Sequence, residues 1–184
     1  MANFKISLTG DLGSGKSTVS KILQERFGAE IISVGRLQRE MAAELNMDTC
    51  AFNEYQRSHP EYDKILDGKT AEYEPIDGNF IFDSRLAWHF VPSAFSVYLK
   101  CDYAEAAKRI MEAKRQDESF DSVAEAEASI RTRRERERQR YAEFYGVDIL
   151  DMTNYDAVID TKNKTPEEVS DTIVAEWKKY LNNK

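Results

Sequence analysis

The sequence has few of the features that mark membrane-spanning or secreted proteins. No apolar run approaches the ~20 residues that a helix needs to cross a bilayer. The opening stretch, MANFKISLTG, is typical of a strand and lacks the basic, apolar and small-residue regions of a secretory signal. We therefore expect a soluble cytoplasmic protein with no membrane partner, and 184 residues allow one substantial core.

Cysteine is also scarce. The two cysteines, Cys50 and Cys101, cannot build a disulfide framework, and no group of cysteines and histidines has the spacing of zinc ligands. Both cysteines stand beside apolar residues. We expect two reduced thiols that serve packing.

The chain has no overall excess of positive charge. Its formal net charge of −7 at pH 7 argues against general binding to nucleic acid. A small anionic ligand is compatible with this charge, because nearby groups set the field of a site. One tract, RTRRERERQR at residues 131–140, concentrates six arginines and two glutamates.

Short apolar segments alternate with segments of helical periodicity along the chain. This alternation predicts an α/β fold, in which a parallel sheet of about five strands is covered by helices on both faces. Strands are expected at residues 4–8, 29–33, 79–83, 95–100 and 157–160. Helices are expected at residues 16–27, 35–45, 48–59, 62–73, 104–115, 122–146 and from 165 onward.

Two of the expected helices begin with capping signals. Ser122 and Glu125 form a capping-box pattern before a long polar helix that is expected to end at Gly146. The stretch TPEE at residues 165–168 has the same pattern, with proline at the first helical position. The residues of this last helix that we expect to point inward are Val169, Ile173, Trp177 and Leu181.

The most informative stretch is GDLGSGKS at residues 10–17, between the first expected strand and an amphipathic helix. This is the context of a G-x-x-x-x-G-K-S phosphate-binding loop, or P-loop, in which backbone N–H groups and the helix start surround an anion. Lys16 is expected to reach the outer phosphates of ATP, and Ser17 to hold Mg²⁺. The predicted ATP-binding residues are Gly10, Asp11, Leu12, Gly13, Ser14, Gly15, Lys16, Ser17 and Thr18.

The P-loop alone does not identify the reaction, because motors, switches and kinases all use it. A GTP switch carries D-x-x-G and N-K-x-D motifs. No aspartate of this chain has a glycine three residues later, and the stretch NKTP at residues 163–166 has proline in place of the base-reading aspartate. A motor or an AAA-type ATPase needs a longer chain. A kinase for a small molecule fits best.

Such a kinase needs cationic groups that hold a second phosphate in line with the first. Arg39 follows the second expected strand, and Arg85 follows the third. Arg133, Glu137 and Arg140 occur at i, i+4 and i+7 and share one face of the long helix. Each feature alone also suits a surface ion pair or a solvated helix face. Together, in one P-loop chain, they are expected to meet at the carboxyl edge of the sheet.

Stretches that span nearly the whole chain match one family of kinases. They are ISLTGDLGSGKSTVSKIL, ISVGRLQREMA, FNEYQRSHPEYDKILD, FIFDSRLA, RERERQRYAEFYGVDILDMTNYDAVIDT and TPEEV, and the tract from Arg133 to Thr161 is the most specific. The chain resembles the nucleoside monophosphate kinases, and among them most closely the compact archaeal-type cytidylate kinases. The resemblance implies transfer of a phosphoryl group from ATP, with Mg²⁺, to CMP or dCMP, by a monomer or a weak homodimer.

The resemblance also implies a P-loop kinase of three parts. The core would comprise residues 1–34, 76–115 and 147–184, with an acceptor-binding arm at about 35–75 and a lid at about 116–146.

Individual roles follow from the same resemblance. Lys16 would hold the donor phosphates, Asp83 would support Mg²⁺ together with Ser17, and Arg133 and Arg140 would be lid arginines that neutralise charge during transfer. These assignments make Lys16, Asp83, Arg133 and Arg140 the implied catalytic residues. The implied acceptor-binding residues are Ser33, Gly35, Arg39, Arg85 and Glu137.

The chain departs from the family pattern at Arg36, Ser84 and Trp88, all in the region of the acceptor pocket. Residues 160–164 would lie near the adenine of ATP. In the arm, Asp63 and Asp67 either contact a base or sugar or form a solvated helix face.

Two other functions fit the same motifs. A P-loop kinase for a shikimate-like or sugar-acid acceptor would use Asp83 as a base. A non-catalytic nucleotide-binding protein of the same fold would keep the P-loop without phosphorylating an acceptor.

Overall fold

The computed structural model describes residues 3–112 and 120–183, apart from the side chains of Thr49 and Cys50. The prediction for Cys50, the expected helix end at residue 115 and the start of the lid lie outside the described residues, whereas Cys101 is a buried free thiol. Five strands form one sheet in the order β2-β3-β1-β4-β5, and every neighbouring pair is parallel, which confirms the predicted α/β fold. The strands are β1 (Lys5–Gly10), β2 (Glu30–Ser33), β3 (Phe80–Asp83), β4 (Phe95–Lys100) and β5 (Ala157–Asp160).

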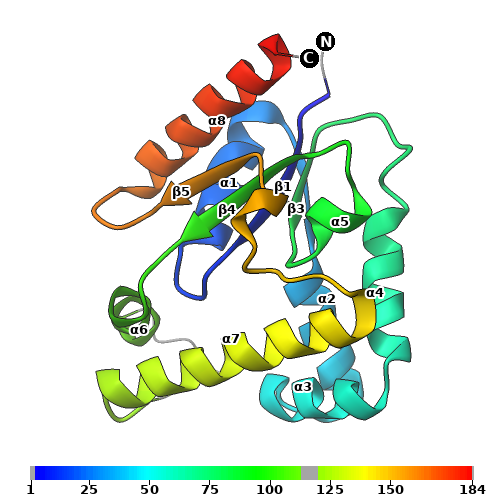
Figure 1. Ribbon diagram of the computed structural model, residues 1–184, viewed down its shortest axis with the longest axis vertical. Coiled ribbons are helices and arrows are strands. Elements are labelled where there is room, and N and C mark those ends of the chain that lie inside the picture. Colours follow the sequence, from blue (N-terminus) through cyan, green and yellow to red (C-terminus); the bar gives the residue numbers. More distant parts are fainter. Residues whose placement is uncertain (1–2, 113–119, 184) are drawn as a thin grey trace.

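One face of the sheet is covered by α1 (Lys16–Phe27) and α8 (Pro166–Asn182), which pack against each other (Figure 1). Leu181, predicted to point inward, is 37% exposed. Tyr180 packs on the core in its place, with its ring centroid 5.0 Å from that of Phe95. Alternate strand residues fill this core, among them Ile6, Leu8, Ile81, Val97, Leu99 and Ile159.

The other face is covered mainly by short segments. Phe80 and Phe82 of β3 pack there against α5 (Ala87–Phe90). This face is less covered at the edge strand β5, where Val158 is 44% exposed. Neither α5 nor the 3₁₀ turn η1 (Met152–Asn154) was predicted, because a single turn is too short to show helical periodicity.

A helical excursion joins the carboxyl end of β2 to β3. It consists of α2 (Val34–Glu44), α3 (Thr49–Ser58) and α4 (Glu61–Ala71). The Ser33 side chain caps α2 by accepting a hydrogen bond from the backbone N–H of Arg36 at 3.3 Å. Because α2 starts where β2 ends, its first turn lies at the carboxyl edge of the sheet.

The longest helix, α7 (Val123–Tyr145), packs along α6 (Tyr103–Glu112) and runs past the carboxyl ends of the strands towards α4 (Figure 1). It therefore faces both the P-loop and the excursion. Within residues 3–112 and 120–183, no helix has the length and apolar character of a membrane span.

The caps of α7 follow the prediction in part. Gly146 ends the helix with a left-handed φ of 68°, as its position predicted. Ser122 accepts from the N–H of Glu125 at 3.2 Å, but the Glu125 carboxylate accepts from the N–H of Asp121 instead of Ser122. One bond of the predicted capping box therefore forms here, whereas the box at the start of α8 is complete.

Candidate active site

The P-loop joins the end of β1 to the start of α1, at the carboxyl edge of the sheet. Gly13 and Gly15 have left-handed φ values of 73° and 87°, and a Cβ on Gly13 would lie 2.8 Å from the Cα of Ala106. Only glycine fits such a position. Because α1 begins without a side-chain cap, its first N–H groups are open to an anion.

Hydroxyl and carboxylate oxygens that could bind a metal ion border this loop. The hydroxyl of Ser14 is buried and has no hydrogen-bond partner in the described part of the chain, and Ser17 is exposed. Asp83 ends β3, the neighbour of β1, in register with Leu8. In phosphate sites Mg²⁺ takes a few hydroxyl or carboxylate oxygens together with phosphates and water. Ser17 and Asp83 therefore fit such an ion.

Lys16 bends back over its own loop. Its Nζ donates to the carbonyl oxygens of Gly10 at 3.1 Å and Asp11 at 3.3 Å. Burial, together with the nearby charge of Arg85, lowers the pKa of Lys16 to about 8. A cation held at the mouth of the P-loop is thus ready to exchange these carbonyls for phosphate oxygens.

Arg85, in the turn after β3, also reaches the carbonyl oxygen of Gly10. Its Nη1 also donates to the carbonyl of Gly10, and its Nε donates to Glu137 Oε2 at 2.9 Å. The turn is fixed by Ser84, whose hydroxyl accepts from the N–H of Leu86 at 3.2 Å, and by Trp88, whose Nε1 donates to the Arg85 carbonyl at 3.0 Å. The departures at Ser84 and Trp88 therefore support the backbone that carries Arg85.

Glu137 on α7 sits among arginines. Besides Arg85, Arg133 donates to it, with Nε 3.2 Å from Oε1. Burial alone would raise the pKa of Glu137, but the charges of Arg85, Arg133 and Arg140 lower it to about 2. A carboxylate that is ionised at neutral pH is thus held between cations beside the P-loop.

Ser33 and Arg39 lie at the carboxyl edge of the sheet on the side of β2, Ser33 at the end of that strand and Arg39 in the following helix α2. Ser33 lies opposite Asp83 in the sheet, and its hydroxyl is 3.5 Å from Asp83 Oδ2. Arg39 is exposed, and its Nη1 would be 3.7 Å from a Cβ on Gly35, so the guanidinium lies over the first turn of α2. Arg39 makes no ion pair or hydrogen bond with another described residue. Its guanidinium is therefore available to a ligand at the carboxyl edge.

Arg140 points into the excursion. Its Nη1 donates to Gln56 Oε1 at 3.3 Å, and its Nη2 lies 3.8 Å from Asp63 Oδ1. Asp63 and Asp67 are both buried, so the solvated-face explanation for this pair is wrong. The structure thus brings Lys16, Arg85, Arg133 and Glu137 together and places Arg140 one turn further, towards α4.

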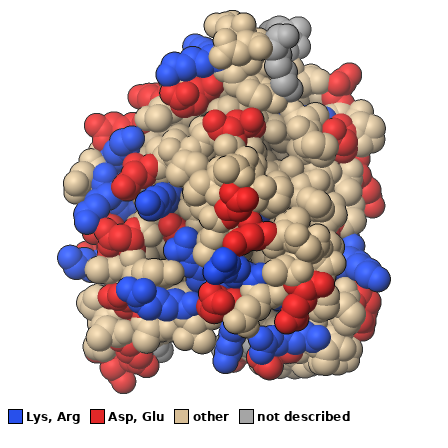
Figure 2. Space-filling view, in the orientation of Figure 1, with Lys and Arg blue, Asp and Glu red and all other residues tan. Residues whose placement is uncertain are grey.

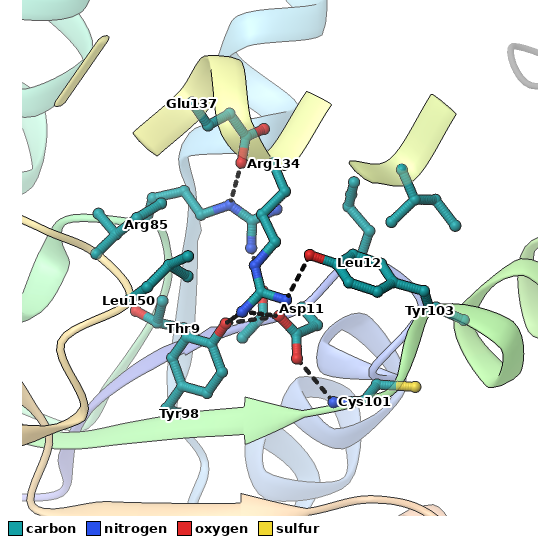
Figure 3. Close-up of a pocket in the computed structure, with 14 residues that line it drawn as sticks. Thr9, Asp11, Leu12, Arg85, Tyr98, Cys101, Tyr103, Arg134, Glu137 and Leu150 are labelled. Carbon is teal, nitrogen blue, oxygen red and sulfur yellow. Dashed lines mark hydrogen bonds and ion pairs between the residues drawn. The ribbon is translucent and has the colours of Figure 1, made fainter. Parts of the chain in front are cut away.

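A second group on the P-loop was not predicted (Figure 3). The Asp11 carboxylate accepts from the Tyr98 hydroxyl at 2.6 Å and from the Cys101 N–H at 2.8 Å, and Arg134 Nη2 lies 3.1 Å from it. Arg134 also donates to the Tyr103 hydroxyl at 3.1 Å. Asp11 therefore ties the P-loop to β4 and α7 through its side chain. Arg134 precedes Glu137 by one turn, a spacing that could have identified it.

Beside the P-loop lies a cavity of about 300 Å³, lined by Gly13, Thr18, Arg109, Thr161 and Lys164 among others. Arg109, which was also missed, donates to the carbonyls of Gly13 at 3.4 Å and Thr161 at 3.0 Å. Thr161 and Lys164 belong to the segment expected near adenine. The volume is within the range of small-molecule sites.

The surface over α7 carries both signs of charge. On the face in Figure 2, Lys and Arg side chains intermingle with Asp and Glu over this helix. Beside the P-loop, Arg85 lies next to Glu137 and Arg134 lies next to Asp11 (Figure 3).

Known protein sequences resemble this chain over most of its length. A family model described as the cytidylate kinase-like family matches residues 5–163. A cytidylate kinase of Thermoplasma volcanium is 35% identical over 175 residues, which cover 90% of this chain and 87% of the relative. An S-adenosylmethionine-dependent nucleotide dehydratase of Lacinutrix mariniflava is 39% identical over 176 residues, 95% of this chain. The chain spans only 36% of that dehydratase's length.

Solved structures resemble the fold. A shikimate kinase of Bacteroides thetaiotaomicron aligns over 97% of this chain and 98% of its own, with a TM-score of 0.64 and 16% identity. At that identity the likeness concerns the fold alone, which is that of P-loop kinases.

Proposed function

The chain belongs to the cytidylate kinase-like family, and from this premise we propose that it transfers the γ-phosphoryl group of ATP to CMP or dCMP, giving the diphosphate. The observation that carries the proposal is the convergence of Lys16 and Arg85 on one P-loop carbonyl, that of Gly10. One cation comes from the donor loop and the other from a separate strand end. Phosphoryl transfer depends mainly on positioning and on neutralisation of phosphate charge, and two cations from different elements would supply both.

The donor side would be formed by the P-loop. Its open N–H groups and Lys16 would bind the outer phosphates, and the cavity beside Arg109 and Thr161 would receive the adenine. Ser17 and Asp83 would hold Mg²⁺, which when bound neutralises phosphate charge. The buried hydroxyl of Ser14, unpaired among the described residues, supports a polar ligand in the loop.

The acceptor side would be formed by Arg85 and Arg39. Arg85 now holds the Glu137 carboxylate, and an incoming phosphate presents the same kind of anionic oxygen to it. Arg39, an exposed residue in the middle of α2 whose guanidinium lies over the first turn, would bind that phosphate from the opposite side. A phosphate monoester already carries an anionic oxygen at neutral pH, so no side chain has to act as a base.

The chain's residues would therefore contribute position and charge. Lys16 and Arg133 would neutralise the charge that shifts between the phosphates during transfer, and closure of α7 over the P-loop would keep water from intercepting the phosphoryl group. The cytidylate kinase relative of Thermoplasma volcanium, of which 87% is matched by this chain, supports a nucleotide acceptor over shikimate or a sugar acid.

A coupled assay of ADP release tests the proposal, with CMP, dCMP, UMP, AMP and shikimate each supplied with ATP and Mg²⁺. We expect stimulation by CMP or dCMP, lost at least 100-fold in Lys16→Met. Lys21→Met is the matched control, because Lys21 is an exposed lysine of the same helix. Turnover with shikimate, or ATP binding without stimulated turnover, would contradict the proposal.

A further inference from the structure

Arg134 joins α7 to three other parts of the chain (Figure 3). Its Nη2 lies 3.1 Å from Oδ1 of Asp11 in the P-loop and donates to the Tyr98 hydroxyl of β4 at 3.2 Å. Its Nη1 donates at 3.1 Å to the hydroxyl of Tyr103, the first residue of α6. One side chain of the long helix is therefore bound at once to the P-loop, to β4 and to α6.

The carboxylate that receives Arg134 is held in position by the sheet. Asp11 is 7% exposed and accepts from the Tyr98 hydroxyl at 2.6 Å and from the Cys101 N–H at 2.8 Å. Both donors belong to β4 or to the residue that follows it. A charged hydrogen bond to a buried, fixed group contributes more than a pair of mobile side chains on the surface. The site thus offers α7 a firm point of attachment.

The other carboxylate contact between α7 and this site involves a cation that the acceptor needs. Glu137 binds Arg85, which in the proposed function binds the acceptor's phosphate, so this contact must weaken when the acceptor arrives. Asp11 meets Lys16 through its backbone carbonyl, at 3.3 Å, and Arg134 through its carboxylate. The contact with Arg134 can therefore persist while Lys16 exchanges its carbonyl ligands for phosphate oxygens.

We infer that Arg134 is a positioning residue that keeps α7 over the P-loop during the reaction, and that its pair with Asp11 limits the loss of the γ-phosphoryl group to water. The inference rests on the proposed function. In transfer, an oxygen of the acceptor's phosphate bonds to the γ-phosphorus, and the bridging oxygen leaves with ADP and the electron pair of the broken bond. In hydrolysis, the oxygen of water forms that bond instead and releases a proton. Both routes break the same bond, so exclusion of water favours transfer.

The surroundings of the pair show why its loss would admit water. Ile130, about one turn before Arg134, is buried against α6, and Leu12 of the P-loop packs on the same apolar cluster. The Nε of Arg134 is buried and has no hydrogen-bond partner among the described residues. Without the guanidinium, Asp11 would keep a buried charge with no cation beside it, and such a charge is stabilised only by hydration. Water would therefore enter between α7 and the P-loop.

Arg134→Met tests the inference, because it removes the charged head and keeps an unbranched side chain. With ATP, Mg²⁺ and CMP supplied, the measured quantity is the ratio of inorganic phosphate released to CDP formed. We expect this ratio to rise about 10- to 100-fold, the factor that corresponds to a hydrogen bond between buried charged groups. Arg134→Lys keeps a cation that can pair with Asp11, so it should recover part of the wild-type ratio.

Arg131→Met is the matched control. Arg131 belongs to the same helix, and its guanidinium carbon lies 4.0 Å from the ring centroid of Tyr103, but it pairs with Glu127 at the surface. We expect the phosphate-to-CDP ratio of this variant to equal that of the wild type. Circular dichroism and thermal unfolding check that each variant folds, and if Arg134→Met does not, Arg134→Lys is compared with the control instead, with a smaller rise expected.

A second measurement reports the position of α7 without turnover. Hydrogen exchange of the amides of residues 123–145 is followed by mass spectrometry, with a non-hydrolysable ATP analogue present. A helix that is less firmly attached opens more often, so exchange in Arg134→Met should be about tenfold faster than in the wild type and in Arg131→Met.

The outcomes separate the inference from the function on which it rests. An unchanged phosphate-to-CDP ratio in Arg134→Met, or exchange in α7 no faster than in Arg131→Met, would overturn the inference and leave the kinase intact. Absence of CDP from the wild type would overturn the proposed function and with it this role of Arg134. A raised ratio and faster exchange that are confined to the Arg134 variants would support the inference.

Discussion

Replacing Asp11 with asparagine is expected to destabilise the protein and to weaken ATP binding together. The Asp11 carboxylate joins the P-loop to the Tyr98 hydroxyl, the Cys101 N–H and Arg134. Both oxygens are in use, and the residue is 7% exposed. Asparagine keeps one acceptor oxygen and turns the other position into a donor, so at least one buried donor loses its partner.

The magnitude follows from these bonds. A hydrogen bond to a charged group contributes ~1.5–3 kcal/mol, and an unpaired buried donor adds its desolvation cost. We expect Asp11→Asn to lower the free energy of unfolding by ~2–4 kcal/mol, or the Tm by ~4–16 °C for a chain of this size. Loosening of the loop is expected to raise KM for ATP.

Thermal unfolding and steady-state kinetics measure the two effects. Asp171→Asn is the matched control, because Asp171 pairs with Arg26 on the surface with its side chain 67% exposed, and such pairs contribute less than ~1 kcal/mol. A double-mutant cycle with Arg134→Met isolates the contact between Asp11 and Arg134. An Asp11→Asn protein with the Tm and KM of the wild type would refute the reasoning.

Three further predictions concern pH. Burial and the Arg85 charge lower the pKa of Lys16 to about 8, so Lys16 loses its positive charge as pH rises through that value. The kcat/KM for ATP should fall over the same range. The pH profile of Lys16→Arg should not show this fall. Burial raises the pKa of Asp67 from 3.8 to about 6, so the free energy of unfolding falls as pH rises through this interval. In urea unfolding, Asp67→Asn should therefore be more stable than the wild type by an amount that grows over the same interval. A gain in stability that does not depend on pH would contradict this. Despite burial, the surrounding arginines lower the pKa of Glu137 from 4.5 to about 2. The ionised carboxylate therefore stabilises the folded protein fully above pH 4.5, and this contribution is lost as pH falls towards 2. Glu137→Gln should not show this loss of stability in acid.

Local patterns allowed much of the fold to be predicted. All five strands appear near the predicted residues because each is a short apolar run between turn signals, and α1 begins at Lys16 and ends at Phe27 as predicted. The P-loop required no tertiary information, since its glycines and its flanking strand and helix are adjacent in sequence. The face of α8 was predicted up to Trp177, and the error at Leu181 arises because Tyr180 takes up the packing at the helix end.

The rest of the site depends on how distant segments meet. Six arginines lie within residues 131–140, and spacing alone does not reveal which of them face the P-loop and which face α4. Arg134 reaches Asp11, and Arg140 reaches Asp63, because α7 runs past both. Arg109 lies on a helix without a recognisable motif. Its contact with Thr161 is a property of the folded chain.

The central claim is that one site holds two phosphates, with Lys16 on the donor side and Arg85 on the acceptor side. A single-turnover experiment with γ-labelled ATP and CMP tests it most directly, in wild-type protein and in Arg85→Met. The claim predicts labelled CDP from the wild type and, from the variant, a much weaker transfer with ATP binding retained. Label released only as free phosphate, or equal transfer by both proteins, would contradict it.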